Sequence, residues 1–394
     1  MDYSSLEARD SKKLKDAVER LQQRIRLGAA SQQAVLERAA KTIIKDRLVP
    51  PKAFTFFTQS IGVVKGAYLG TGPQGADDLA DVVAIHPHAL RQMAAVAGMP
   101  GSYVTKLQNR SHDEKDTWPT DLACHNLNEL FTKGTFKTRR GEPARYLHRV
   151  VNGEVRGFLS RIFNRKLGTL NLLRPFIERC QTYQAGPVEA STTDTRASLK
   201  YMLPHVFEPV DGEFVAVGVT YSNSDFGDGS RSIASTFMRI SAGTIGLVES
   251  STRRHIGSII TDDELEVSDE AQDKELEAQQ LVVRDLVDKH LKPESVERIL
   301  TAIRVAHEQE LPWHRLEVLL NKVLQKKEVQ DVRTMLSNNA SDIIDLPPVR
   351  QDGQGDPIAS AWWAANVLGI MASKTEDASK RAELQGLAGS LVMK

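Results

Sequence analysis

The sequence lacks the features that define several classes of protein. It has two cysteines in 394 residues, Cys124 and Cys180, which are far apart and without the spacing of a metal site. We therefore expect buried thiols in a reducing cytosol. No window approaches roughly 18 uninterrupted apolar residues, so no transmembrane helix is predicted. Residues 1–21 are charged and lack the apolar core of a signal peptide, which favours a cytoplasmic protein.

Recognisable catalytic motifs are also missing. The histidines show no HExxH spacing, and no serine lies in a GxSxG nucleophile elbow. A GxGxxG pattern occurs at residues 70–75, but Asp77, Asp78 and Asp81 follow it and would repel the pyrophosphate of a dinucleotide. We interpret this segment as a glycine-rich turn. The sequence predicts no enzyme, no catalytic residue, no cofactor and no small-molecule substrate.

One polar segment, at residues 223–230, has side chains that suit a hard cation. Asp225 and Asp228 supply carboxylate oxygens, which are the ligands that Ca²⁺ and Mg²⁺ prefer. The segment is too short for an EF-hand loop and lacks its closing glutamate, so we expect a turn built from Asn, Asp and Gly. A metal-dependent enzyme that uses the two aspartates stays open as a minor alternative, and no metal site is predicted.

Charge is unevenly distributed, although the formal net charge is zero. Residues 131–204 contain 14 Lys and Arg against 5 Asp and Glu, and the rest of the chain contains 37 against 46. A strongly basic segment in a neutral chain suggests a polyanionic partner such as nucleic acid. The alternative, which the composition leaves equally open, is that the basic and acidic segments pair with each other within the fold.

Apolar periodicity indicates an α+β fold in three regions. Residues 1–50 are predicted to form N-terminal helices with a break at about 27–30. Residues 51–260 are predicted to form a central α/β core, in which a hairpin, a helix and a strand meander make one mostly antiparallel sheet. Residues 261–394 have a helical pattern throughout and begin with an acidic segment at 262–277.

The clearest β signal is a hairpin around Asn152-Gly153, a dipeptide typical of a two-residue type I′ turn. Such a turn fixes the register, so Arg149 is predicted to lie opposite Arg156 on one face of the sheet. Like charges in that position destabilise a sheet by up to about 1 kcal/mol unless an anion lies between them. Phe158 is predicted to be exposed on the same face, among these cations.

We predict that this face binds nucleic acid. In proteins that bind single strands, cations hold the phosphates and exposed aromatic rings stack on the bases. The alternative is that acidic side chains neutralise the arginines and that the aromatic ring packs beneath a helix. The candidate contacts are Arg145, Arg149, Arg156, Phe158, Arg161, Phe163, Arg165, Lys166, Arg253 and Arg254.

Several blocks of the sequence resemble a family of phage- and plasmid-borne proteins that share a phage/plasmid-like domain of unknown function. VRGFLSRIFNRKLGTLNLL at 155–173 is similar to the family's arginine, Leu-Ser and Tyr/Phe-Arg segment. The block at 215–247 is similar to a strand that ends in Asn-Ser and is followed by glycine. RRHIG at 253–257 and the helix ASAWWAANVLGIMAS at 359–373 also resemble the family, so the resemblance extends from about residue 82 to the end.

The resemblance is incomplete at Phe163, where the family has tyrosine, and at 240–246, which lacks the family's cysteine and asparagine. It implies a mobile-element protein in the cytosol of a bacterial host. At the level of the fold, the hairpin, helix and strands also resemble the ring-forming single-strand annealing proteins of phages. We therefore expect a homo-oligomer that binds single-stranded nucleic acid, DNA rather than RNA, in recombination or replication. The alternative is a non-enzymatic interaction or regulatory factor of a mobile element.

Overall fold

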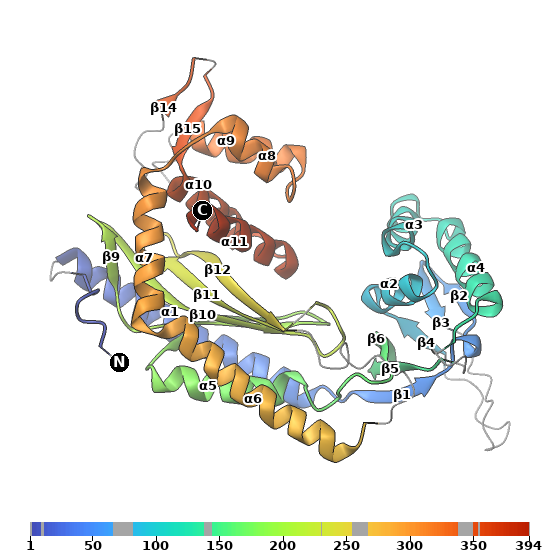
Figure 1. Cartoon of the computed structure of the whole chain (residues 1–394). Coiled ribbons are helices and arrows are strands. Elements are labelled where there is room, and N and C mark those ends of the chain that lie inside the picture. Colours follow the sequence, from blue (N-terminus) through green and yellow to red (C-terminus); the bar gives the residue numbers. More distant parts are fainter. Residues whose placement is uncertain are drawn as a thin grey trace.

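The computed structural model describes residues 2–8, 12–65, 82–137, 144–229, 231–253, 267–337, 350–353 and 355–393. These residues form two lobes, each built around a large sheet (Figure 1). The α+β class predicted from the sequence is confirmed, with α/β elements toward the N-terminus and a helical C-terminal region. None of the described helices has the length and hydropathy needed to cross a membrane.

The smaller lobe is a sheet covered by helices. Its strand order is β1-β5-β6-β4-β3-β2, and every pair is antiparallel except β4 with β6. Phe54, Phe56 and Phe131 form the centre of its core. The elements are β1 (Lys45–Val49), the 3₁₀ turn η1 (Pro51–Ala53), β2 (Phe56–Gln59), β3 (Gly62–Lys65), β4 (Val83–Ile85), α2 (Pro87–Val96), α3 (Gly101–Glu114), α4 (Trp118–Lys133), β5 (Tyr146–Val151) and β6 (Glu154–Ser160).

The larger lobe is built on an antiparallel sheet with the order β12-β11-β10-β8-β7, and β9 pairs with β10. Helices α5 and α6 lie beneath this sheet in Figure 1, and α10 and α11 lie above it. The strands are β7 (Gly186–Thr192), β8 (Ala197–Met202), β9 (Phe207–Val210), β10 (Glu213–Asn223), β11 (Arg231–Arg239) and β12 (Thr244–Arg253). The helices are α1 (Lys12–Lys41), α5 (Thr169–Thr182), α6 (Asp269–Leu291), α7 (Pro293–Glu308), α8 (Trp313–Leu320), α9 (Lys326–Ser337), α10 (Ala361–Lys374) and α11 (Ala378–Val392).

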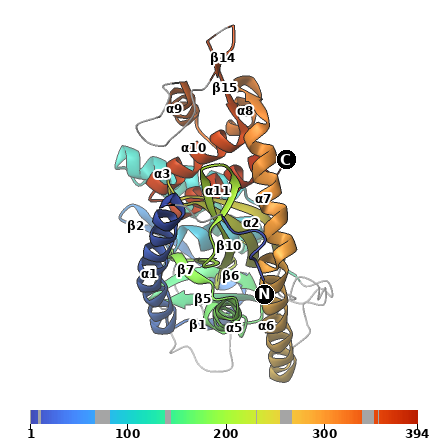
Figure 2. The ribbon, with the colours of Figure 1, turned by 90° about the vertical axis from the view of Figure 1, so that its left-hand side faces the viewer.

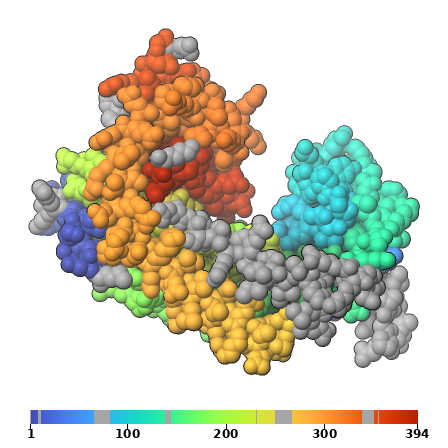
Figure 3. Space-filling model, in the orientation of Figure 1, coloured from blue at the N-terminus to red at the C-terminus, as the bar shows by residue number. Residues whose placement is uncertain are grey.

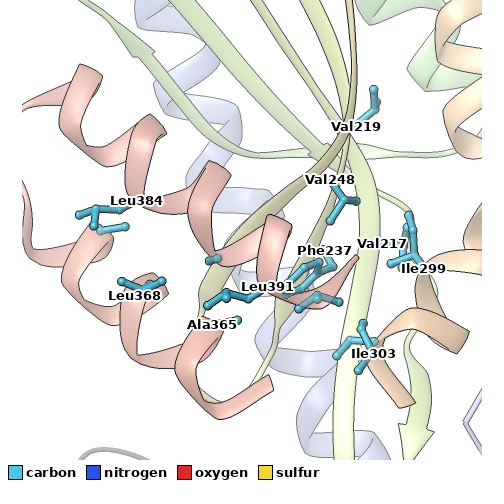
Figure 4. Close-up of a cluster of buried hydrophobic side chains, with 14 of the residues drawn as sticks. Val217, Val219, Phe237, Val248, Ile299, Ile303, Ala365, Leu368, Leu384 and Leu391 are labelled. Carbon is cyan, nitrogen blue, oxygen red and sulfur yellow. The ribbon is translucent and has the colours of Figure 1, made fainter. Parts of the chain in front are cut away.

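Two long-range contacts close the larger lobe. Helix α1 runs beside β7 (Figure 2), where Gly28 lies so close to the strand that a Cβ atom would come within 2.1 Å of the Pro187 carbonyl oxygen. On another side, apolar side chains of the sheet meet α7, α10 and α11 in a continuous core (Figure 4). Phe237, Ile303 and Leu391 are members of that core, and each side chain of this size stabilises the fold by about 1.5–3 kcal/mol when fully buried.

Four sequence predictions about this architecture are wrong. Helix α1 is continuous, without the expected break at 27–30, and residues 45–49 form β1 instead of the end of a helix. The hairpin and the meander lie in different sheets, because β5 and β6 pair with strands of the smaller lobe. The C-terminal region also contains a small sheet of β13 (Glu310–Pro312), β15 (Pro357–Ser360) and β14 (Arg350–Gln351).

Candidate binding site

The hairpin of β5 and β6 has the predicted turn but not the predicted register. Residues 152 and 153 both have positive φ, 51° and 77°, as a type I′ turn requires. Beyond the first two residue pairs, a bulge lets Arg149 pair with Gly157 and leaves Arg156 as the extra residue. The predicted opposition of the two arginines is therefore wrong, and the like charges do not face each other across the strands.

The bulge also moves Phe158 to the other face of the sheet, since a shift of one residue exchanges the two faces. Phe158 is 3% exposed, it pairs with His148, and its ring stacks on Tyr146 with 4.7 Å between centroids. The prediction that this ring is exposed is wrong. Phe163 is half-buried, and its ring centroid lies 5.4 Å from the guanidinium carbon of Arg149.

Arg149 and Arg156 connect the two lobes. Arg149 is 4% exposed, with Nε 3.0 Å from a carboxylate oxygen of Asp46 in β1. Its Nη1 donates to the main-chain carbonyl of Asp225, in the loop between β10 and β11, at 2.5 Å. Arg156 donates to the carbonyl of Asp194, between β7 and β8, at 3.2 Å. Each arginine thus belongs to the smaller lobe and contacts a loop of the larger one, which gives both a structural role at the junction.

Lys166 and Arg165, which follow the hairpin, are paired as well. Lys166 Nζ lies 2.7 Å from a carboxylate oxygen of Asp273 in α6, and Arg165 Nε lies 3.7 Å from Asp46. The acidic start of α6 therefore contacts the basic segment. Of the two interpretations that the composition left open, pairing within the fold holds for Arg149, Arg156, Arg165 and Lys166.

The remaining predicted contacts are Arg145, which is exposed, and Arg161, which is half-buried. The side chain of Arg253 and the whole of Arg254 lie outside the described residues, and so does the glycine-rich motif at 70–75. Nucleic-acid contact by these arginines stays a prediction.

The loop of Asp225 and Asp228 is a hydrogen-bonded turn, as the sequence analysis favours. A carboxylate oxygen of Asp225 accepts from the Thr169 amide at 2.6 Å, and one of Asp228 accepts from the Thr195 hydroxyl at 2.6 Å. Burial raises the pKa of Asp225, while the nearby Arg149 guanidinium opposes that rise. Among the described residues, no three His, Cys, Asp or Glu side chains are grouped as a metal site would require.

The larger sheet carries a row of small hydroxyl groups on the face toward α11. Ser198 of β8 pairs with Ser191 of β7 on one side and with Ser222 of β10 on the other, and Ser222 pairs with Ser232 of β11. Directly paired residues of antiparallel strands point to the same face, so the four serines form one row across four strands. We call these residues the serine row.

A parallel row lies next to the serine row. Lys200 pairs with Glu189 on one side and with Thr220 on the other, and Thr220 pairs with Ala234. Lys200 is 5% exposed, and its Nζ lies 2.6 Å from a Glu189 carboxylate oxygen. Burial lowers the pKa of Lys200, and the Glu189 carboxylate opposes this. A charged pair is thereby held inside the sheet face.

These two rows form the floor of a cavity of about 540 Å³, and residues 378–386 of α11 form one wall. Arg196 and Asp228 line the side nearest the lobe junction, where Arg196 Nη1 donates to the Asp228 carbonyl at 2.8 Å. In the wall, Arg381 lies 3.6 Å from Glu189. Figure 3 shows the molecule hollowed between the C-terminal helices, in red, and the smaller lobe, in cyan.

Two residues that line this cavity each have a buried polar atom with no hydrogen-bond partner among the described residues. The atoms are Oγ1 of Thr220, on the floor, and Oε1 of Gln385, in the wall; the two residues are 5% and 4% exposed. Buried polar groups in native proteins are nearly always paired. Because both atoms are buried, they are not open to the cavity itself.

Comparison of the chain with protein-family models, with curated proteins and with solved structures found no match. The function therefore has to be inferred from the chemistry of the cavity itself.

Apart from Asp228, the sequence analysis did not single out the residues of the cavity. The signal was present in the strands, where apolar and polar residues alternate: Val219 and Tyr221 are in the core, whereas Thr220 and Ser222 face the cavity. A period of two with hydroxyl side chains on one face predicts a sheet face that is not covered by a hydrophobic layer. No comparable signal marks Gln385, because its place depends on how α11 packs on the sheet.

Proposed function

We propose that the chain binds single-stranded nucleic acid in the hollow between α11 and the smaller lobe, with one nucleotide of the strand in the cavity over the serine row. The protein would hold the strand without catalysing a reaction. A role in recombination or replication of a phage or plasmid, with DNA as the natural strand, follows from the sequence resemblance and is part of the proposal.

The cavity carries this proposal. Its volume of about 540 Å³ lies within the range of roughly 300–1,000 Å³ that is usual for small-ligand sites, which suits one nucleotide and excludes a duplex. Its floor offers hydroxyl groups and the Lys200–Glu189 pair, and its sides hold Arg196 and Arg381. Such a mixture of fixed cations and neutral hydrogen-bonding groups matches a phosphate joined to a polar base.

The cavity is a better candidate than the hairpin for contact with the strand. The hairpin cations are largely used in ion pairs, and the ring of Phe158 is buried. By contrast, the serines at positions 191, 198 and 232 are partly exposed and line a cavity of about 540 Å³.

Fluorescence anisotropy of labelled oligonucleotides, single- and double-stranded and of the same sequence, tests the proposal across a salt series. We expect single strands to bind and duplexes to bind much more weakly. The lining contains Arg196, Lys200 and Arg381 against Glu189, Asp228 and Glu383. Because these charges balance, few counterions are released, and the affinity should fall only weakly with salt.

Ser198→Phe fills the cavity above the serine row and should abolish binding, whereas Ser198→Ala keeps the cavity open and should bind as the wild type does. Circular dichroism and thermal unfolding check that both variants fold. Absence of single-strand binding by the wild type at low salt would overturn the proposal. Binding that falls steeply with salt and survives in Ser198→Phe would assign the contact to exposed cations such as Arg145.

A second candidate, a protein–protein interaction factor, is favoured by one observation in the smaller lobe. Helix α4 exposes Trp118, Leu122 and Leu130 at 42%, 39% and 37%, and these positions lie on one stripe of the helix. Grouped exposed apolar side chains mark contact surfaces. If a second copy of the chain covers this stripe, Leu122→Asp should lower the mass measured by size-exclusion chromatography with light scattering, and Asp121→Asn should not.

A further inference from the structure

The smaller lobe is an insertion in the chain of the larger lobe. Helix α1 precedes it and helix α5 follows it, so the chain crosses between the lobes at residues 42–44 and 161–168. No described strand of the smaller sheet pairs with a strand of the larger one. Among the described residues, the core cluster of the smaller lobe also shares no member with those of the larger lobe. Lobes joined in this way, without a common core, are expected to move relative to each other.

One loop of the larger lobe, residues 224–229, is held by the smaller lobe, and we call it the latch loop. The main-chain carbonyl of Phe226 accepts hydrogen bonds from Nε2 of His88 and from Nε2 of Gln92, each at 3.0 Å. These two residues are one turn apart on the same face of α2. The Phe226 side chain is 5% exposed and lies against Gly157 of β6, where a Cβ atom would be 3.4 Å from that of Phe226. The smaller lobe thus holds the middle of the latch loop.

The latch loop also reaches the cavity, and its own hydrogen bonds tie its two parts together. The hydroxyl of Ser224 accepts from the main-chain amides of Phe226 and Asp228, at 3.1 and 2.9 Å. Asp228 lines the cavity, where its carbonyl accepts from Nη1 of Arg196 at 2.8 Å. A loop tied in this way responds as one unit when the smaller lobe holds or releases Phe226. The position of the smaller lobe is therefore passed on to Arg196.

We propose that docking of the smaller lobe on the latch loop controls how tightly a strand binds, an inference that rests on the proposed binding of single strands. With the lobe docked, the Asp228 carbonyl holds the guanidinium of Arg196 at the end of the cavity nearest the junction. With the lobe undocked, the loop loses the donors to Phe226, and Arg196 loses its fixed orientation toward a phosphate. The strand affinity then falls in proportion to the fraction of docked molecules, and a bound strand favours docking in return.

A double substitution, which we call the latch variant, tests the loop directly. His88→Leu with Gln92→Glu removes both donors and places a carboxylate oxygen next to the Phe226 carbonyl. The glutamate keeps the side-chain oxygen that accepts a main-chain amide within the smaller lobe. His125→Leu with Gln59→Glu is the matched control, because it makes the same two changes at exposed positions of the same lobe. Circular dichroism and thermal unfolding check that both variants fold.

The distance between the lobes is measured without nucleic acid, by pulsed electron paramagnetic resonance. Nitroxide labels are attached to Asp121→Cys in α4 and Lys327→Cys in α9, both exposed positions, whereas the two native cysteines are buried. We expect one main distance in the wild type and in the matched control, and a longer and broader distribution in the latch variant. An unchanged distribution in the latch variant would overturn the role of the latch loop.

A disulfide between the lobes separates docking from any other effect of the substitutions. The 3.4 Å between the two Cβ positions is close to the spacing of about 3.5–4.5 Å in disulfides, so Gly157→Cys with Phe226→Cys should be oxidised readily. The latch variant should bind a labelled thymidine oligonucleotide about tenfold more weakly than the wild type, as expected when about a tenth of the molecules are docked. When the two cysteines are added to it, oxidation should restore most of the affinity, and reduction should remove that gain.

The outcomes distinguish the inference from the proposed function. If no strand binds the wild type, the proposed function fails, and control of binding by docking fails with it. If the lobes separate in the latch variant but its strand affinity equals that of the wild type, the proposed function stands and the inference is overturned. If the affinity falls and the oxidised disulfide does not restore it, the loss has a cause other than undocking, and the inference is again overturned.

Discussion

Replacing Arg149 with methionine removes a buried cation whose partners lie in both lobes. The change leaves the carboxylate of Asp46, which is 14% exposed, with Arg165 at 3.7 Å as its remaining ion-pair partner among the described residues. It also removes the donor to the Asp225 carbonyl. Breaking a buried ion pair from one side costs about 3–5 kcal/mol. Because proteins are stable by only about 5–15 kcal/mol in total, we expect a large loss of stability.

Urea unfolding measures this loss. Trp118 lies in the smaller lobe, whereas Trp313, Trp362 and Trp363 lie in the C-terminal region. Fluorescence of a variant that retains only Trp118, compared with circular dichroism of the whole chain, shows which lobe unfolds first. Arg145→Met is the matched control, because Arg145 is exposed and surface changes of this kind alter stability by about 0.5 kcal/mol or less.

The sequence analysis leads to a different expectation for the same arginine, and this makes the experiment decisive. If Arg149 held phosphates on an exposed sheet face, its loss would weaken nucleic-acid binding and leave the unfolding midpoint unchanged. That result would refute the structural role argued above. A lower midpoint in Arg149→Met that Asp46→Asn largely restores in the double variant would support it, since the double variant no longer buries an unpaired charge.

Three further measurements test other parts of the structure. Glu213→Gln breaks the buried, doubly hydrogen-bonded pair with Arg239, at 2.7 and 2.8 Å, and should destabilise the larger lobe by about 3–5 kcal/mol in urea unfolding. Burial lowers the pKa of His290 to about 4, below the value of about 6.5 that a histidine has in an unfolded chain. The free energy of unfolding should therefore be highest, as far as this group is concerned, above about pH 6.5 and should fall as the pH drops from about 6.5 toward 4. A constant free energy of unfolding over that range would contradict the burial of His290. Burial raises the pKa of Cys124 to about 11 and that of Cys180 well above its ordinary value, so a thiol reagent at neutral pH should react with either only after denaturant is added.

Local signals predicted most helices and strands of the larger lobe. Helix α5 and strands β10 and β11 lie close to where periodicity places them, because apolar residues recur at helical or strand spacing along each one. The failures have a tertiary cause. Gly28 suggests a helix break when considered locally, yet in the fold it allows α1 to approach Pro187 closely. Residues 45–49 pair with β5, a strand about 100 residues away in sequence.

The hairpin shows why a correct turn does not guarantee a correct surface. The Asn-Gly signal predicted the turn, and the first two pairs of the ladder follow from it. The extra residue of the bulge, Arg156, contacts Asp194 in the other lobe, and no local pattern records that contact. That one extra residue moved Phe158 from a predicted exposed position into the core, and with it the predicted stacking site.

The charge asymmetry of the sequence is used mainly within the molecule. Arg149 pairs with Asp46, Lys166 with Asp273 and Arg179 with Asp288, so cations of the basic segment meet acidic residues from outside it. A basic stretch is therefore weak evidence for a polyanion partner when its counterions lie elsewhere in the same chain. Recognition by neutral hydrogen-bonding groups in a charge-balanced cavity depends little on the net charge of the chain, and its expected signature is single-strand binding that falls only weakly with salt.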